Sequence, residues 1–427
     1  MKTRHGAFWI RQFVCLHLRA PIAQTFYSAR VIGVIRSLGF ILVVASQTRL
    51  DTLGAQATPW TKSYASPAAI IEVPESLLRI DLNGTDALEF FRVVGMFPRA
   101  DGSFLVVNGA TNELRYFDAQ GKFVSRAGRK GGGPGEYQSL QSASIVSLRG
   151  DSLAILDGMA RRISIVSRTE ALVRSVPTAQ TPPGVGSATR IVALPSGSLL
   201  VGFAEVRTMA PQPDAVAIHD QFFTISTTSG ALQPTPLRGL IGDHFVQATT
   251  PEHGGIAYWD LVFGRKGSAV GTRTGVLMGE GTDWSIQEYS PAGVLVGTHR
   301  VMRKVALLTM TERDEYRANA MNSAKGADSI STERRVREMP YPKNKPAYNR
   351  IVGEADGDRV WVQPYPSGKD APNDWVRLTP QTSVAEVFRL PARFNALAFS
   401  SSRVYGVWRD RDDVEHVRVY ELPALRK

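Results

Sequence analysis

The last stretch of the chain, residues 395–422, reads NALAFSSSRVYGVWRDRDDVEHVRVYEL and contains three strand-length runs. The runs are NALAFS (395–400), VYGVWRD (404–410) and EHVRVYEL (415–422), with polar turn residues between them. Short apolar and β-branched runs separated by turn signals are typical of antiparallel strands. No fourth run follows before residue 427, and this matters because every earlier group of runs has four members.

The grouping into four occurs five times upstream of this stretch. The first quartet is FFRVVG (90–95), FLVVNG (104–109), LRYFDAQG (114–121) and FVSRAG (123–128). The other quartets span residues 142–176, 188–237, 266–301 and 348–390. A four-stranded unit that recurs about every sixty residues fits a propeller blade with some long loops. The sequence therefore predicts an all-β fold built from repeated four-stranded antiparallel blades.

The incomplete last group of runs indicates how a ring of blades would close. An open sheet edge in a β array invites aggregation, so a ring of blades has to close. The segment AIIEVPESLLRIDL (69–82) belongs to no quartet and contains two strand-length apolar runs. We predict that this N-terminal segment supplies the outer strand of the last blade and closes a six-bladed β-propeller. Two separate β-sandwiches are the alternative.

The densest glycine cluster is AGRKGGGPGEY (127–137), between the first two quartets. A P-loop needs Ser or Thr after its Gly-Lys pair, but Lys130 precedes the glycine run. A dinucleotide loop opens a helix, but Pro134 interrupts the run and a strand pattern follows. We therefore interpret the glycines as a crossing between blades, where positive φ and close approach are needed.

This glycine cluster also resembles a known family. After YFDAQGKFVSRAG (116–128), the run GGGPGEY (131–137) is similar to the NHL-type signature of bacterial six-bladed β-propeller proteins. The stretch KPAYNRIVGEADGDRVWVQ (345–363) resembles a late-blade pattern of the same proteins. The resemblance covers roughly residues 65–427 and implies an exported propeller, but no particular reaction.

The N-terminal part, residues 1–57, is basic and resembles an export signal. It has seven Lys or Arg against one acid, and the rest of the chain has 43 basic and 38 acidic residues. Arg36 precedes the apolar run Leu38–Ala45, and Ala55-Gln56-Ala57 fits a cleavage site. The run is too short to span a bilayer. We predict a signal peptide in residues 1–57, a propeller over 65–427 and export to the periplasm or medium, which also removes the single cysteine, Cys15.

Loop length predicts which face of the ring carries function. Connections between second and third strands and between blades are long, for example residues 205–221, 238–265 and 366–374. In an up-and-down blade both kinds of connection emerge on the same face. The longest insertion contains the helical signal, at about 305–340: Thr309 and Glu312 fit a capping box, and Ser331 fits the cap of a second helix. This helical pair is either a lid or a patch over an exposed edge.

Two functions from different classes fit these features. We favour an exported, non-catalytic propeller, a monomer without nucleic-acid partners or a transmembrane span, which binds a peptide, glycan or protein on its loop-rich face. Trp offers amphipathic contact area, and Arg can hold a carboxylate or phosphate. The candidate ligand-binding residues are Arg129, Lys130, His244, Trp259, Asp260, Asp283, Trp284 and Arg350.

The alternative is a lactonase-like hydrolase or lyase with a divalent metal such as calcium in the central channel. His244 and His253 share a loop with Asp243 and Glu252, but their spacing fits no helix or strand pair, and solvated loop histidines are the preferred interpretation. The expected inner strands are poor in acids, and no G-x-S-x-G motif occurs. We therefore expect no cofactor in the favoured function.

Overall fold

The computed structural model describes residues 58–65, 69–84, 88–169, 171–178, 181–206, 216–235, 237–250, 255–324, 328–366 and 372–424. The chain separates into two units, Met1–Gln56 and Ala57–Lys427, and the second unit contains all the described residues. The predicted signal peptide and Cys15 lie outside the described residues.

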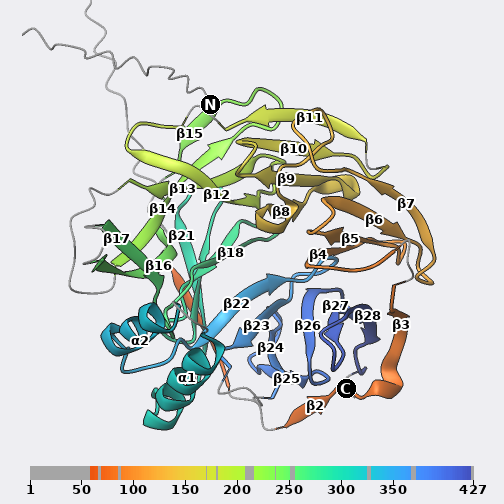
Figure 1. Cartoon of the computed structure of the whole chain (residues 1–427). Helices are drawn as coiled ribbons and strands as arrows, with labels where there is room; N and C mark the ends of the chain where they lie inside the picture. The colour runs from red at the N-terminus through yellow and green to blue at the C-terminus, as the bar shows by residue number, and fades with distance from the viewer. Residues whose placement is uncertain are drawn as a thin grey trace, which may run out of the picture. The chain divides into compact units, whose positions relative to one another are not determined.

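The second unit is a ring of six β-sheets, which we number as blades 1–6 (Figure 1). Blade 1 has four strands: β4 (Val93–Pro98), β5 (Phe104–Asn108), β6 (Glu113–Phe117) and β7 (Phe123–Ala127). Blade 2 also has four: β8 (Ser144–Ser147), β9 (Leu153–Asp157), β10 (Arg162–Val166) and β11 (Leu172–Pro177). Blade 3 is larger: β12 (Val185–Ala193), β13 (Leu199–Glu205), β14 (Val216–Ile225), β15 (Leu232–Pro234), β16 (Leu240–Thr250), β17 (Gly255–Asp260).

Blades 4, 5 and 6 each combine late strands of the chain with one early strand. Blade 4 contains β18 (Ser268–Gly271), β19 (Val276–Gly279), β20 (Ser285–Tyr289), β21 (Leu295–Val301) and β1 (Trp60–Tyr64). Blade 5 contains β22 (Tyr348–Gly353), β23 (Val360–Pro364), β24 (Asp374–Leu378), β25 (Glu386–Arg389) and β2 (Ile70–Glu72). Blade 6 contains β26 (Phe394–Phe399), β27 (Arg403–Arg409), β28 (Glu415–Glu421) and β3 (Leu78–Leu82).

Strand β3 closes the ring, as the incomplete last quartet predicts. It pairs antiparallel with β28, with Ile80 opposite Val419 and Leu82 opposite Val417, and lies beside it in Figure 1. The six-bladed β-propeller is therefore confirmed, and the alternative of two β-sandwiches is wrong.

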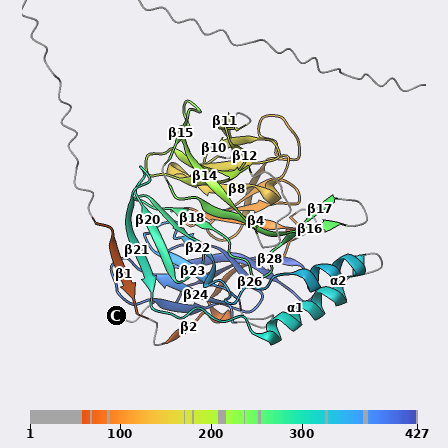
Figure 2. The same ribbon diagram turned by 90° about the vertical axis from the view of Figure 1, so that its left-hand side faces the viewer.

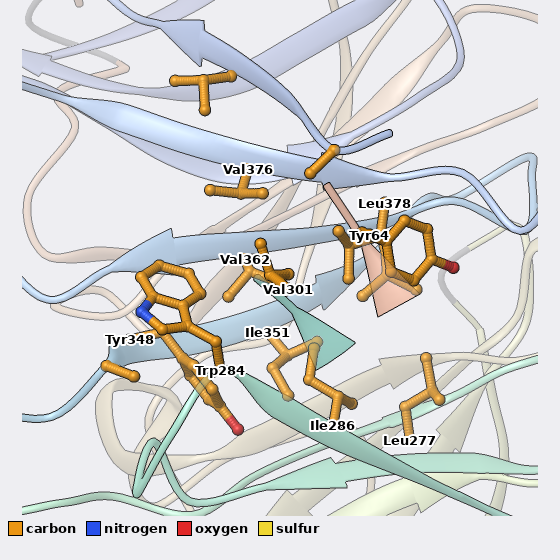
Figure 3. Close-up of a cluster of buried hydrophobic side chains, with 14 residues drawn as sticks. Tyr64, Leu277, Trp284, Ile286, Val301, Tyr348, Ile351, Val362, Val376 and Leu378 are labelled. Atoms are coloured by element: carbon orange, nitrogen blue, oxygen red, sulfur yellow. The ribbon is translucent and has the colours of Figure 1, made fainter. Parts of the chain in front are cut away.

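The blades stack on one another through six buried apolar clusters among the described residues, one for each pair of neighbouring blades. Figure 3 shows the cluster between blades 4 and 5. Because each sheet is covered on both faces, successive residues of a middle strand are all buried, as in β5 and β9. This explains why the second-strand runs read as continuous apolar stretches rather than alternating ones.

The N-terminal segment contributes strands to more blades than the sequence predicts. We predicted that the segment 69–82 supplies the outer strand of the last blade, and its second run, β3, does so, but its first run, β2, pairs parallel with β25 of blade 5. Upstream of it, β1 pairs parallel with β21 of blade 4. Residues 58–82, which we call the strap, thus add one outer strand to each of three successive blades.

Two further predictions need correction. The connection 238–265 is not a loop, because β16 and β17 form an antiparallel hairpin that joins blade 3 through β14. Helix α1 (Met310–Ser323) has the predicted capping box of Thr309 and Glu312. Helix α2 (Asp328–Glu338) begins three residues before Ser331, which lies inside the helix and does not cap it. The described residues also contain three short 3-10 turns: Glu75–Leu77, Leu140–Ser142 and Arg149–Asp151.

Candidate functional site

The elaborated connections gather on one face of the ring. Figure 2 shows α1, α2 and the β16–β17 hairpin projecting from the same side, as the loop lengths predict. We call this side the long-loop face and the opposite side the short-turn face. Functional residues concentrate on loops that a rigid scaffold positions, so the long-loop face is where a binding site is expected.

A cavity of about 370 Å³ lies on this face between blades 5 and 6, and we call it the blade 5–6 cavity. Its walls come from the β23–β24 and β25–β26 connections, the first strand of blade 6 and the start of the helical insertion. The lining residues are Arg303, Gln363, Pro364, Tyr365, Pro366, Pro372, Asn373, Asp374, Arg393, Phe394 and Asn395.

Arg350 on β22 fixes two amide side chains of this cavity. Its guanidinium donates from Nε to Oε1 of Gln363 at 3.0 Å and from Nη2 to Oδ1 of Asn395 at 2.9 Å. A guanidinium has only donors, so it must face the oxygen of each amide. The amide nitrogens of Gln363 and Asn395 remain as donors. Burial lowers the pKa of Arg350 to about 10, so the side chain stays charged at neutral pH.

Cations dominate the rim of the blade 5–6 cavity. The Arg303 guanidinium lies 4.9 Å from the ring centroid of Trp284, in a cation–π contact. No carboxylate pairs with Arg303 within the described ranges. The one acid of the lining, Asp374, is neutralised by a two-point contact with Arg389, whose Nε lies 2.7 Å from Oδ1 and whose Nη2 lies 3.1 Å from Oδ2. The cavity therefore presents donors and positive charge, which suits an anionic, acceptor-rich ligand.

A neighbouring hollow of about 500 Å³ extends this cationic surface over the edge of blade 4. It shares Arg303 with the blade 5–6 cavity and adds Arg300 and Lys304. Asp283 lines it as well, and its Oδ1 accepts the backbone N–H of Ser285 at 2.9 Å. Two adjoining hollows with a common arginine form one continuous candidate surface.

The structure brings three of the predicted ligand-binding residues to this surface. Asp283 is exposed on it, Trp284 is buried under Arg303, and Arg350 orients the two amides. Trp284 also packs at 6.1 Å against Tyr348, so its ring is part of the blade 4–5 core. The ligand-binding role of these residues stays a prediction.

The other five predicted residues lie elsewhere. Trp259 and Asp260 end β17 in the hairpin of blade 3, and His244 lies in β16 opposite Ala217, with its side chain outside the described atoms. Arg129 and Lys130 lie in the glycine crossing between blades 1 and 2. Their binding role also stays a prediction, and they do not share a cavity with Arg350.

The loop of the glycine crossing binds the carboxylate of Glu136, a residue of the same loop. Oε2 of Glu136 accepts the backbone N–H of Gly133 at 2.7 Å, and Arg129 donates to Oε1 at 2.8 Å. A Cβ added at Gly131 would lie 2.1 Å from Oε2 of Glu136, so a larger residue there would displace the Glu136 carboxylate. Arg162 binds the carbonyl oxygens of Gly132 and Gly133 from the next blade. The cluster is a crossing held by internal hydrogen bonds, as we interpreted it.

Sequence reasoning missed the residues that define the blade 5–6 cavity. Arg303 follows the fourth strand of blade 4 without any motif, and its neighbours in space come from two other blades. One signal was present, because the second residue of the first strand is asparagine in both blades 5 and 6, Asn349 and Asn395. Among the described residues, no group of three or more His, Cys, Asp or Glu could hold a metal ion.

Comparisons with known proteins agree with this architecture. Residues 80–165 match a family model described as a 6-bladed beta-propeller, and the six closed blades place the chain in this fold class. No curated protein matches the sequence. Within the described segments, no helix has the length and apolar character needed to cross a membrane.

Several solved structures are similar to the chain at low sequence identity. A candidate exported protein from Bacteroides fragilis is 12% identical with a TM-score of 0.45, covering 86% of this chain and 100% of its own. Virginiamycin B lyase from Staphylococcus aureus is 11% identical with a TM-score of 0.39, covering 80% and 97%. The calcium-binding protein regucalcin from Agrobacterium tumefaciens is 11% identical with a TM-score of 0.39, covering 84% and 98%. Superpositions this loose carry no conclusion about activity.

Proposed function

We propose that this chain is an exported binding propeller that recognises an acidic group of a peptide, glycan or protein partner on its long-loop face. The observation that carries the proposal is the donor-rich blade 5–6 cavity, in which Arg350 turns the amide nitrogens of Gln363 and Asn395 away from itself. Arg303 adds a cation that lacks a carboxylate partner in the described part of the chain.

Charge and shape both support an anionic ligand. A carboxylate or sulfate accepts several hydrogen bonds at once and gains most where the donors are charged and already oriented. The guanidinium of Arg350 also donates to the carbonyl oxygen of Ala396. This contact holds the guanidinium in place and therefore fixes the orientation of the two amide groups. The rim offers the ring of Tyr365 and three prolines, which give apolar contact for the body of a peptide or sugar.

The metal-dependent hydrolase or lyase has no specific observation in its favour. A catalytic metal site needs three or so protein ligands close together. The described residues bring together no such group of His, Cys, Asp and Glu side chains. The binding function is therefore the better supported of the two.

The test is direct binding of acidic and neutral probes by isothermal titration calorimetry. Suitable pairs are hexaglutamate with hexaglutamine, and oligogalacturonate with a neutral dextran of equal length. We expect at least one acidic probe to bind and its neutral counterpart to bind more weakly. Arg303→Met and Asn395→Leu should each weaken binding of the acidic probe by roughly tenfold, the effect of losing one charge-assisted hydrogen bond.

Arg149→Met is the matched control for this test. Arg149 is exposed in the β8–β9 turn on the short-turn face, so the variant makes the same charge change away from the site. Equal affinities for acidic and neutral probes, or affinities unchanged in Arg303→Met and Asn395→Leu, would overturn the proposal.

A further inference from the structure

A second cavity, of about 520 Å³, opens on the short-turn face between blades 4 and 5. We call it the strap cavity, because strand β1 of the strap forms one of its walls. The other walls come from the β18–β19 turn, β20, β21 and two turns of blade 5. The lining residues are Trp60, Lys62, Thr272, Arg273, Thr274, Leu277, Glu288, His299, Asp358, Val360, Pro380 and Gln381.

Alternation along β1 directs three side chains of the strap to the same side. Trp60, Lys62 and Tyr64 occupy every second position of the strand and therefore share one face of it. Trp60 lies against Gly297 of β21, where an added Cβ would be 2.1 Å from Cε2 of the indole. The absence of a side chain at Gly297 thus seats the Trp60 ring at the cavity wall.

A hydrogen-bonded chain of three side chains, Tyr64, His299 and Glu288, borders the strap cavity, and the last two of them line it. The hydroxyl of Tyr64 lies 3.0 Å from Nδ1 of His299, and Nε2 of His299 lies 3.2 Å from Oε2 of Glu288. An imidazole protonated on Nε2 donates to Glu288 and accepts from Tyr64, so both contacts are satisfied. Figure 3 shows Tyr64 at the end of the blade 4–5 core opposite Trp284, with its hydroxyl directed away from the core.

Among the charged side chains that line the strap cavity, Lys62 is the cation without a carboxylate partner in the described part of the chain. Glu288 is engaged by His299 and by the hydroxyl of Thr274, which donates to Oε1 at 2.9 Å. Asp358 pairs with Arg273 at 3.4 Å. Lys62 is half-buried, and its ammonium group donates to the carbonyl oxygen of Pro380. The ammonium group also lies 5.5 Å from the ring centroid of Tyr64, but no carboxylate pairs with it within the described ranges, so it retains N–H donors for an anionic partner.

We propose that the strap cavity is a second binding site, for a small ligand with a flat apolar body and a single carboxylate. Lys62 binds the carboxylate, and the apolar body lies among Trp60, Leu277 and Val360. An ammonium group removed in part from water gains most from an anionic partner, because its own hydration is already reduced. The volume is in the range of small-molecule sites, and an apolar lining with a few convergent polar groups is typical of them.

The experiment compares two probes of the same shape, 2-naphthoate and 2-naphthamide. Binding to the full-length mature protein is followed by quenching of tryptophan fluorescence and by calorimetry. We expect naphthoate to bind roughly tenfold or more tightly than naphthamide, as one charge-assisted hydrogen bond predicts. Lys62→Met should abolish this preference, and Lys62→Arg should keep it.

Two controls keep the result interpretable. Arg149→Met, on the same face but in blade 2, should keep the affinity and the preference for naphthoate. Gln381→Trp places a bulky ring at an exposed position of the lining and should reduce binding of both probes without a change in melting temperature. Equal affinity for the two probes, a preference that survives Lys62→Met, or no binding of either probe would overturn the proposal. Arg303→Met should have no effect, which separates this site from the long-loop face.

Discussion

Replacing Ile80 with Ala tests whether the ring is held shut by the strap. Ile80 lies in β3, is 6% exposed and belongs to the cluster between blades 6 and 1. It packs so closely on the turn of blade 1 that a Cβ at Gly121 would be 2.7 Å from its Cγ2. The substitution removes three buried carbons, worth about 2.4 kcal/mol at about 0.8 kcal/mol each. With the cavity left behind, the loss falls in the range of about 2–5 kcal/mol.

That loss converts into a measurable shift of the melting temperature. For a unit of about 370 residues, an unfolding entropy of about 2.1 cal/mol/K per residue makes this loss equivalent to about 3–6 °C. Calorimetry and urea titration would measure it in the mature protein. The control is Arg79→Ala, one residue earlier in β3, where an exposed pair with Glu421 is lost and almost no shift is expected. An Ile80→Ala protein as stable as Arg79→Ala would refute closure through buried packing of β3.

Three further predictions concern the strap and its cavity. The hydrogen bond from His299, then that from Thr274, holds the pKa of Glu288 below its ordinary value. A lowered pKa means that this carboxylate stabilises the fold at neutral pH and loses the effect as pH falls through the lowered value. Urea midpoints of Glu288→Gln should therefore lie below wild type at pH 7 and approach it in acid. Gly297→Ala should displace the Trp60 indole, shifting tryptophan emission to the red in wild type but not in a Trp60→Phe background. Cleavage after Ala57 should give Thr58 as the first residue when the exported protein is sequenced from its N-terminus.

The sequence predicts most of the fold because the signals for it are local. Four runs and their turns identify a blade, and the missing fourth run of the last blade identifies the strand that closes it. The strand β1, WTKSY, gave no such signal because it is not an apolar run, and nothing local indicated that the run containing β2 pairs with blade 5, since it joins that sheet without a turn. The hairpin β16–β17 was missed because the composition of PEHGG (251–255) favoured the interpretation of 238–265 as a loop.

The candidate sites were harder to predict because each is assembled from separate blades. Trp284 could be proposed as a binding residue from its type, but only the fold places Arg303 over it. Gln363 and Asn395 belong to strands of different blades, and a single arginine between them decides which amide atoms face outward. In the strap cavity, Lys62 and His299 are more than two hundred positions apart in the chain. A pattern within one segment has no means of indicating such a pairing.

The position of the strap gives a physical reason why both candidate sites lie in blades 4–6. Blades 4 and 5 each receive a fifth strand from the strap, β1 and β2, and blade 6 receives its fourth, β3, whereas blades 1 and 2 end in β7 and β11. A further hydrogen-bonded strand at the outer edge opposes local opening of the blade, because the edge can no longer fray without breaking that ladder. Binding sites need side chains held in place by such rigid support, since looseness in the supporting residues lowers affinity. The strap therefore stiffens blades 4 and 5, which border the two cavities, and in blade 4 the same strand that provides this support, β1, also supplies Trp60 and Lys62 to the strap cavity.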